Sequence, residues 1–476
     1  MIQALSAVDV SPRVLAIKAG PPVVVFLAIL LAPAPEGLTE EGKRSLAVMA
    51  LAVVLWATEA LPIGVTGMLS LVLLVLIKAV ADIEVALYGF SQPVPYFLIG
   101  ILTLGLAVHK SGLAERSALY LVRLAGGNAT RLYVQMLISF ALLTFALPSA
   151  TTRSAILVHV YEQVMDKWRT PRESPLNRAV MMAMGSLNRL ASTALLAGGI
   201  TPVVASSLLS QSLDVDFSWT RWFALMALPF YAILVVGGAG VYLLYRSGFR
   251  GGSGVIARVE AAGPLALAEK KAALIAAGTA LLWFTDFAHG LPPAVPALIA
   301  LVVILTPGLG LLSWREFERD IGWSSFFVIA TSLSLAHALI GSGAAAWFAD
   351  TLVGGVEGLR GSPILLLLAL SGAAAVVRVL MPSIVGYLAF VIPVAMATGA
   401  SLGLNPLVCG LAVVIVGDSA VYYPAGSASS IFVFQRSGIR APEVFRFGLI
   451  MTGVSIAVLF AIVLPYWSLI GEGLTR

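Results

Sequence analysis

The feature that most constrains this chain is a series of apolar runs of about 20 residues, each long enough to cross the hydrocarbon core of a bilayer. The runs recur throughout the 476 residues, of which 59% are hydrophobic and 11% are charged. They are continuous, whereas the strands of a membrane β-barrel alternate apolar and polar residues. The pattern therefore predicts an all-α polytopic membrane protein and excludes a set of soluble domains.

Two of these runs are broken near their middle by a Pro-Ser pair. Pro148-Ser149 interrupts the segment 132–165, and Pro382-Ser383 interrupts the segment 363–398. Proline removes a backbone donor and disrupts a helix, and one straight helix of either length would overshoot the bilayer. We therefore expect two re-entrant helical hairpins, whose tips mark a transporter binding site near the middle of the membrane.

Two further spans are interrupted by glycine and proline. Gly198-Gly199 and Thr201-Pro202 fall within the span 179–209, and Gly417-Asp418 and Pro424 fall within the span 406–433. Freed backbone groups are tolerated in a membrane only where protein or a polar cavity surrounds them. We expect both spans to be unwound at these positions.

Landmarks of the first half recur in the second half at nearly constant spacing. Leu61-Pro62 recurs as Leu291-Pro292 after 230 residues, and the two Pro-Ser pairs lie 234 residues apart. This spacing predicts about eleven transmembrane spans in two inverted repeats, each with a re-entrant hairpin and an unwound span. The predicted divisions are an N-terminal span and loop at 1–44, a first repeat at 45–245, a connecting loop at 246–271 and a second repeat at 272–476.

The distribution of basic residues predicts the orientation. With the N-terminus in the cytoplasm, 20 of the 29 Lys and Arg residues fall in cytoplasmic segments and six fall outside. This excess follows the positive-inside rule, so we expect an integral protein of the plasma (inner) membrane with the lipid bilayer around it. The same bias accounts for the net charge of +5, and no nucleic acid is expected as a partner.

Four ionisable residues lie deep in apolar sequence: Arg153, Arg189, Arg378 and Asp418. A lone charge at the bilayer centre costs about 2.5–3.5 kcal/mol or more, so such residues face a polar cavity or a partner. One interpretation is an internal Arg–Asp pair that stabilises the helix bundle. The other is anion binding, because three arginines against one aspartate leave an excess of positive charge that a bound anion compensates.

Hydroxyl side chains gather at the helix breaks. Broken helices present free N–H groups and positive dipole ends, and hydroxyl groups add further donors that suit a carboxylate, sulfate or phosphate. Single Ser and Thr residues in membrane helices more often serve packing, so the inference rests on their clustering. The candidate binding residues are Ser149, Thr151, Thr152, Ser383, Thr201, Ser427, Ser429 and Ser430.

Enzymatic chemistry has little support in the sequence. Val416-Gly417-Asp418 is similar to the Gly-x-Gly-Asp signature of intramembrane aspartyl proteases, but Ile415 replaces the first glycine and a second intramembrane aspartate is missing. No His-Glu-x-x-His motif for zinc occurs, and the single cysteine, Cys409, excludes an intramolecular disulfide. We expect neither an enzyme nor a resident cofactor or metal.

Two segments carry a family resemblance. Trp56-Ala-Thr-Glu-Ala-Leu-Pro-Ile-Gly-Val-Thr66 is similar to the Trp-x-Thr-Glu-Ala-Leu-Pro segment of divalent anion:sodium symporters, and His109-Lys-Ser-Gly-Leu-Ala-Glu-Arg-Ser-Ala-Leu119 is similar to the surface-helix segment of that family. The resemblance extends from about Trp56 to Trp467. It implies a homodimer in which a transport domain moves against a scaffold domain by an elevator mechanism.

The hairpin tips depart from the Ser-Asn-Thr pattern of the family. They read Ser149-Ala150-Thr151 and Ser383-Ile384-Val385, so both tip asparagines are absent. The resemblance implies that Ala150 and Ile384 stand at substrate-site positions, where asparagines and neighbouring carbonyls form the family's sodium sites. Because Ala150 and Ile384 supply no side-chain oxygen, we expect sodium coupling to be weakened or absent.

Together these observations predict a secondary active transporter of a small divalent anion, such as a dicarboxylate or sulfate. We expect sodium-independent exchange or proton linkage. Arg153, Arg189 and Arg378 would take the electrostatic role of sodium, with Asp418 as a neutralising partner or proton site. A sodium-coupled symporter with unusual ligands and an anion channel are the alternatives.

Overall fold

The chain is helical throughout the part that the structure describes. In this computed structural model, those residues are 12–58, 60–147, 149–213, 217–250, 263–354, 361–381, 383–424 and 426–475. No strand occurs among them, which confirms the all-α fold class. Pro148 and Pro382, on which the two predicted hairpin breaks rest, lie outside the described residues.

The first helices include four apolar ones and the segment 109–119 that resembles the surface helix of the family. The sequence predicts a fourth apolar span at about 94–108 before that segment, and the structure has α5 at Pro93–Lys110. A glycine with φ of +83°, Gly112, separates the fourth predicted span from the predicted surface helix, because glycine adopts this left-handed conformation at low cost. The surface helix buries small residues on one face, including Ala114 and Ala118. The elements are α1 (Pro12–Leu31), α2 (Glu40–Thr58), α3 (Ile63–Leu76), α4 (Ile83–Ala86), η1 (Tyr88–Phe90), α5 (Pro93–Lys110) and α6 (Leu113–Arg123).

Both predicted hairpins and both predicted unwound spans are pairs of helices. Three residues separate the arms of each hairpin, and the same order of broken elements occurs in both halves. The hairpin arms are α7 (Ala129–Ala146) with α8 (Ala150–Lys167), and α18 (Pro363–Leu380) with α19 (Ile384–Ser401). The broken spans are α9 (Pro175–Thr193) with α10 (Ile200–Leu213), and α20 (Pro406–Ser419) with α21 (Ala428–Ser437). Inversion of the repeats and re-entrance of the hairpins stay predictions.

The remaining helices connect these broken elements. The long ones are α11 (Trp219–Leu244), α12 (Leu267–Phe284), α14 (Ala294–Leu305), α16 (Trp323–Gly341), α17 (Ala344–Gly354) and α22 (Ala441–Val458). A π-helical turn, Leu459–Val463, joins α22 to α23 (Leu464–Leu469). Two short helices, α13 (Asp286–His289) and α15 (Trp314–Asp320), lie next to α12 and α16 in the sequence.

The described helices fit a membrane protein in length and composition. Six of them, with α22 and α23 taken as one, are long and apolar enough to cross a bilayer, and six shorter apolar helices accompany them. Helices of 12–17 residues fall short of the about 20 that a straight span needs. Among these short helices, α10 and α20 belong to the broken spans. The total of eleven crossings therefore stays a prediction.

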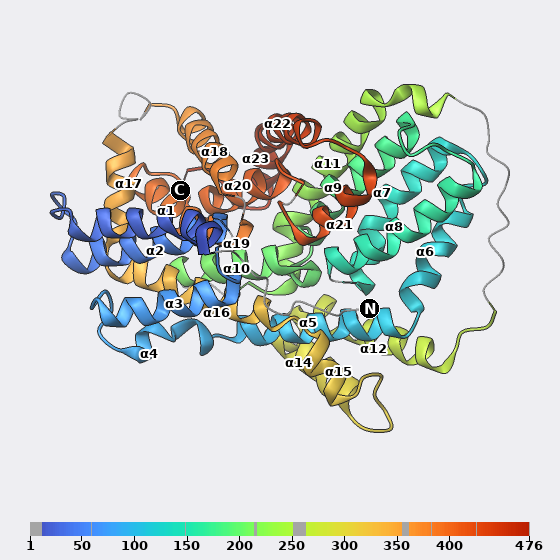
Figure 1. Cartoon of the computed structure of the whole chain (residues 1–476), viewed down its shortest axis with the longest axis horizontal. Helices are drawn as coiled ribbons and strands as arrows, with labels where there is room; N and C mark the ends of the chain where they lie inside the picture. Colours follow the sequence, from blue (N-terminus) through green and yellow to red (C-terminus); the bar gives the residue numbers. More distant parts are fainter. Residues whose placement is uncertain are drawn as a thin grey trace.

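Two large apolar cores hold the helices together, and a third, small cluster joins Ile99 to Phe317 and Ile321. The smaller core lies at one end of the molecule, where α2 and α3 pack against α16 and α17 (Figure 1). The larger core contains the broken helices together with α5, α11 and α22. The helix breaks therefore lie in the larger core.

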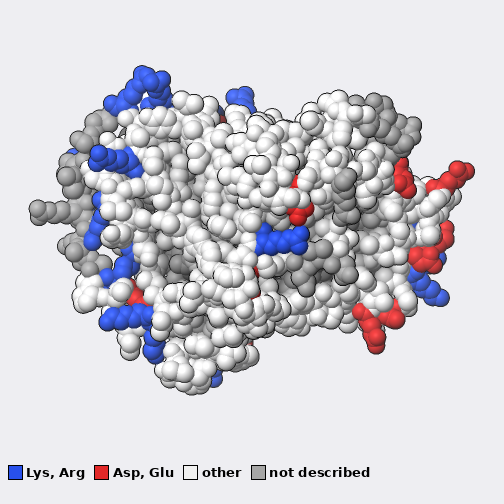
Figure 2. Space-filling view, turned by 180° about the vertical axis from the view of Figure 1, so that it is seen from behind, with Lys and Arg blue, Asp and Glu red and all other residues white. Residues whose placement is uncertain are grey.

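Charged side chains divide between the two ends of the molecule. On the face that Figure 2 shows, most of the Lys and Arg side chains lie toward one end and most of the Asp and Glu side chains lie toward the other, with a few basic side chains in the middle and at the acidic end. The acidic end carries the turn between α1 and α2, with Glu36, Glu40 and Glu41 close together in sequence. Under the positive-inside rule this division predicts that the acidic end faces outside; the orientation stays a prediction.

Candidate functional site

The first helix break presents the N-terminus of α8. Ser149 caps this helix, because its Oγ accepts a hydrogen bond from the N–H of Thr152 at 3.2 Å. Thr151 is exposed, and Ser149, Ala150 and Thr152 are partly exposed. The predicted binding residues of the first tip are therefore accessible at the free end of a helix, where N–H groups favour an anion.

The second helix break presents the N-terminus of α19 in the same way. Ser383 caps this helix by accepting from the N–H of Gly386 at 3.3 Å, and Ile384 is partly exposed. Gly386 is packed closely against α2, since a Cβ at this position would lie 2.8 Å from the indole ring of Trp56. The second tip therefore packs against Trp56, in the segment that carries the family resemblance.

Arg153 ties the first tip to α9. Its guanidinium donates to the carbonyl of Leu147 at 2.7 Å, to the carbonyl of Asn188 at 3.1 Å and to the Oδ1 of Asn188 at 3.1 Å. A further bond reaches the Oγ of Ser192 at 2.6 Å. The carbonyls at the end of a helix lack partners within it. Arg153 supplies a partner for the carbonyl of Leu147, the residue directly after α7. Its side chain is fully buried.

Arg378 makes the equivalent tie at the second tip, from the opposite arm. It donates to the carbonyl of Met381, which precedes the second break as Leu147 precedes the first. A second bond reaches the carbonyl of Gly417 on α20 at 2.9 Å, and the guanidinium carbon lies 6.0 Å from the ring centroid of Tyr387. Both tips are thus bonded to the broken span of their own half through a buried arginine.

Arg189 and Asp418 form a buried ion pair between α9 and α20. Thr193 also donates to the carboxylate, and the Oγ1 of Thr201 lies 3.4 Å from it. The Nη1 of Arg189 has no hydrogen-bond partner in the described part of the chain. Arg378 bonds to the carbonyl of Gly417, the residue before Asp418, so the second tip and this pair lie in one charged region.

The serines predicted at the fourth break cluster at the start of α21. Ser427 caps this helix by accepting from the N–H of Ser430 at 3.1 Å, and the Oγ atoms of Ser427 and Ser429 lie 3.0 Å apart. The Oγ of Ser430 donates to the carbonyl of Gly185 on α9 at 2.8 Å. Ser429 and Ser430 are buried and Ser427 is partly exposed. Among the three, Ser427 is therefore the accessible one.

Both unwound spans break at part of the predicted positions, because Gly198-Gly199 lies between α9 and α10 and Pro424 lies between α20 and α21. Gly417-Asp418 lies inside α20, and the break falls after Ser419. A Cβ at Gly417 would lie 2.2 Å from the ring of Tyr387, so this glycine serves close packing and not unwinding. Thr201-Pro202 lies in the first turn of α10, where a proline costs no hydrogen bond.

Three polar residues on α9 that were not predicted from the sequence also bind the charged residues of this region. Asn188 and Ser192 bind Arg153, and Thr193 binds Asp418. Positions four apart share one face of a helix. Asn188 and Ser192 therefore form one polar face in an apolar segment, and Arg189 and Thr193 form a second. This spacing was the available signal.

The structure links the three arginines and the aspartate that the sequence singled out. Arg153 bonds to Asn188, the neighbour of Arg189, and Arg378 bonds to Gly417, the neighbour of Asp418. Thr201 joins them at the carboxylate. The expectation that Ser149, Thr151 and Ser383 line one shared cavity stays a prediction.

Comparison with known proteins decides the family. A model described as the sodium:sulfate symporter transmembrane region matches residues 15–472. The chain belongs to this family. The match confirms the resemblance to divalent anion:sodium symporters, and the protein is a membrane transporter and not an enzyme. As a member it is divergent, because both tip asparagines are absent.

The relatives within and around this family are distant. A citrate/succinate antiporter of Escherichia coli (strain K12) is 24% identical and covers 94% of this chain and 97% of its own length. An L-tartrate/succinate antiporter of Shigella boydii is 22% identical, with 94% and 96% covered. The crystal structure of the Alcanivorax borkumensis YdaH transporter superposes over 98% of this chain and 99% of its own, with a TM-score of 0.51 and 14% identity. That likeness concerns the fold alone.

Proposed function

We propose that this protein is a secondary active transporter that exchanges small dicarboxylate-class anions across the membrane without sodium. The observation that carries the proposal is the bonding of Arg153 and Arg378 to the carbonyls that precede the two helix breaks. The family resemblance implies that sodium is held at these tips by asparagines and carbonyls. A fixed guanidinium here bonds to tip carbonyls and supplies positive charge without a cation being carried.

The charge balance of the region supports an anion as the substrate. Arg189 and Asp418 balance each other, and the described partners of Arg153 are all neutral. The Nη1 of Arg189 is a buried donor left for an anion. The capped N-termini of α8, α19 and α21 add N–H groups and positive dipole ends. The proposed contacts are Ser149, Ala150, Thr151, Thr152, Ser383, Ile384, Thr201 and Ser427, with Ser429 and Ser430 behind them.

The activities of two relatives favour dicarboxylates as the substrate class and exchange as the mode of transport. A citrate/succinate antiporter and an L-tartrate/succinate antiporter each align with most of the chain. Exchange also follows from the charges, because an empty carrier with uncompensated positive charge crosses a membrane poorly. A bound dianion would compensate that charge on each crossing.

The proposed movement is an elevator within a homodimer. The broken helices would form the mobile body, and α1, α2 and α3 with their counterparts in the second half would form the scaffold. The separate small core around α2, α3 and α16 supports this division. Apolar side chains exposed on α3, such as Val65 and Val72, are available to a partner or to lipid. Native mass spectrometry that finds only monomers across mild detergents would contradict the dimer.

The function is tested with purified protein in proteoliposomes. Uptake of labelled succinate is measured into vesicles preloaded with succinate or left empty, with sodium or choline outside. We expect uptake only into preloaded vesicles, at the same rate with either cation. Sulfate and chloride loading distinguish a dicarboxylate exchanger from a sulfate carrier. Flux into empty vesicles that follows the voltage alone would identify a channel instead.

A further inference from the structure

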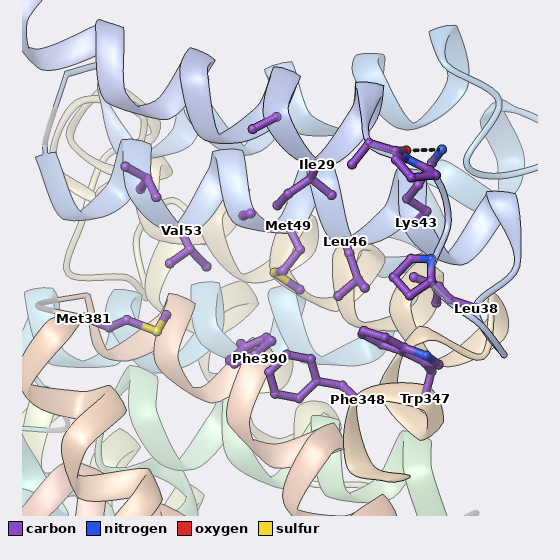
Figure 3. Close-up of a pocket in the computed structure, with 16 residues that line it drawn as sticks. Ile29, Leu38, Lys43, Leu46, Met49, Val53, Trp347, Phe348, Met381 and Phe390 are labelled. Atoms are coloured by element: carbon purple, nitrogen blue, oxygen red, sulfur yellow. Dashed lines mark hydrogen bonds between the residues drawn. The ribbon is translucent and has the colours of Figure 1, made fainter. Parts of the chain in front are cut away.

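An apolar cavity of about 580 Å³ lies between the N-terminal helix pair and the second hairpin. Helices α1 and α2 form one wall, and α17, α19 and the end of α18 form the other (Figure 3). Its lining is carbon-rich, with Met49, Val53, Phe348 and Phe390 among the contacts. The volume is in the range of ligand sites, which run from about 300 to 1,000 Å³.

The two ends of this cavity differ in chemistry. Figure 3 shows Met381 at one end and Lys43, Leu38 and Trp347 at the other. Lys43 is the single charged residue among the described lining residues. Its ammonium group donates to the carbonyl of Ala32 at 3.0 Å and pairs with Glu40 at 3.0 Å. The three N–H donors of this ammonium group therefore face the carbonyl of Ala32 and both carboxylate oxygens of Glu40, at 3.0 and 3.2 Å.

A second, polar depression adjoins the charged end. It shares Trp347 with the cavity, and Glu36 and Asp350 lie on its rim. The indole N–H of Trp347 donates to the carbonyl of Glu36 at 3.0 Å. Tryptophan with this arrangement is typical of the boundary between lipid tails and head groups. The cavity thus passes from an apolar interior to a mouth with one cation, Lys43, and three carboxylates, those of Glu36, Glu40 and Asp350.

Water does not suit the interior of this cavity, because an ordered water needs two to four polar partners and apolar cavities stay dry. In a membrane-spanning chain the surrounding medium is hydrocarbon, so an acyl chain is the available apolar occupant. The mouth carries more negative than positive charge, and the carboxylates of Glu36 and Asp350 complement the amine of a lipid head group. A free fatty acid would leave those carboxylates without a partner.

We propose that this cavity binds one acyl chain of a phospholipid with an amine head group, as in phosphatidylethanolamine. The chain enters beside Lys43 and ends against Met381. The carbonyl of Met381 accepts the bond from Arg378 that ties the second tip. The bound lipid therefore packs directly behind that tip and links the composition of the bilayer to its stability.

The test uses a phosphatidylethanolamine that carries a photoreactive diazirine near the end of one acyl chain. The full-length protein is illuminated in vesicles, and labelled peptides are mapped by mass spectrometry. We expect labelling concentrated at Met381 and on α2 near Val53, the end of the cavity away from Lys43, with competition by unlabelled phosphatidylethanolamine and weaker competition by phosphatidylglycerol. Equal labelling of all lipid-facing helices would overturn the site, and equal competition by both lipids would overturn the head-group assignment.

Two filling variants and a matched control separate the cavity from the general lipid surface. Val53→Trp fills the cavity, and Ala50→Leu fills it with a smaller side chain. Val72→Trp introduces the same indole on the exposed face of α3. We expect the cavity labelling to be lost in the first two variants and kept in the third. Since a ligand that binds only the folded state raises its stability, added phosphatidylethanolamine should raise the Tm of the wild type and Val72→Trp but not of the filled variants. A lipid-dependent rise in Tm that is the same in all four proteins would overturn the proposal.

Discussion

Arg189 and Asp418 lie 229 residues apart in the sequence and join the two halves of the protein in one buried ion pair. The adjacent residues receive the other buried arginines: Asn188 accepts from Arg153, and the carbonyl of Gly417 accepts from Arg378. The dipeptides Asn188-Arg189 and Gly417-Asp418, which the ion pair joins, therefore connect both helix breaks and both broken spans. This arrangement explains how a protein without tip asparagines can hold its two tips in place.

The ion pair itself should be strongly coupled. Removing one partner leaves an uncompensated buried charge, so Arg189→Met or Asp418→Leu alone should cost about 3–5 kcal/mol of folding free energy. The double variant should be much less destabilised than the sum of the two. Thermal unfolding in detergent measures all three, with Arg440→Gln, whose side chain is 83% exposed beside Glu443, as a control that should leave Tm nearly unchanged. Additive losses would contradict a direct pair.

Asn188 should be required for exchange. Asn188→Ala removes the acceptor of the Arg153 Nε–H and the amide that donates to the carbonyl of Ala150 at 3.0 Å. A hydrogen bond to a charged group contributes about 1.5–3 kcal/mol, so we expect the exchange rate to fall about tenfold or more. Asn177→Ala, on the same helix but bonded to the carbonyl of Arg172, is the control and should retain exchange. Equal rates in the two variants would remove Asn188 from the site.

The contact between α15 and α5 should weaken in acid. Hydrogen bonds from Ser313 and the ion pair with Lys110 lower the pKa of Glu316 from 4.5 to about 2. Hydrogen bonds from Arg319 and Lys110 also lower the pKa of Asp320. A carboxyl group with a lowered pKa stabilises the fold fully above its ordinary pKa and loses that effect as the pH falls toward the folded value. We therefore expect Tm to be constant near neutral pH and to fall below about pH 4.5.

The variant Glu316→Gln isolates this contribution. This variant should lower Tm at pH 7 and flatten the decline of Tm below pH 4.5, because Glu316, one of the two titrating carboxyl groups, is gone. The measurement is differential scanning fluorimetry in detergent across pH 3–8. A wild-type Tm that falls between pH 8 and 6, with no change in the variant, would assign the pH dependence to other groups.

The charge division seen in Figure 2 gives a prediction of topology. Cys409 is fully buried, so thiol labelling starts from a low background, and Cys409→Ser removes it. In that background Glu36→Cys, at the acidic end, should react with a membrane-impermeant maleimide in intact cells. Glu173→Cys, in the exposed segment between α8 and α9, should react only after permeabilisation. The reverse pattern would invert the predicted orientation.

The sequence was informative wherever a local signal decides the structure. The Pro-Ser pairs predicted both pairs of hairpin arms, because proline interrupts a helix whatever surrounds it. Composition predicted a membrane protein, and the resemblance of the segment Trp56 to Thr66 predicted the family. Ser149 and Ser383 are predicted binding residues, and both cap the helices that begin at the breaks; their contact with a substrate stays a prediction.

The partners of the charged residues could not be predicted, because they depend on how distant segments pack. Arg153 and Asn188 are 35 residues apart, and nothing in either segment specifies their contact. Gly417 was read as a point of unwinding, whereas its neighbour Tyr387 is what requires a glycine there. Local sequence does not distinguish a glycine that frees the backbone from one that admits a ring.

The central claim is that fixed guanidinium groups replace a carried cation. It is tested most directly by the sodium dependence of succinate exchange in wild-type protein, Arg153→Gln and Arg378→Gln, each reconstituted in vesicles preloaded with succinate. We expect wild-type exchange to have the same rate in sodium and in choline, and we expect no uptake of succinate into empty vesicles. Both variants should lose exchange. Strong sodium-dependent uptake into empty vesicles, unchanged in both variants, would contradict it.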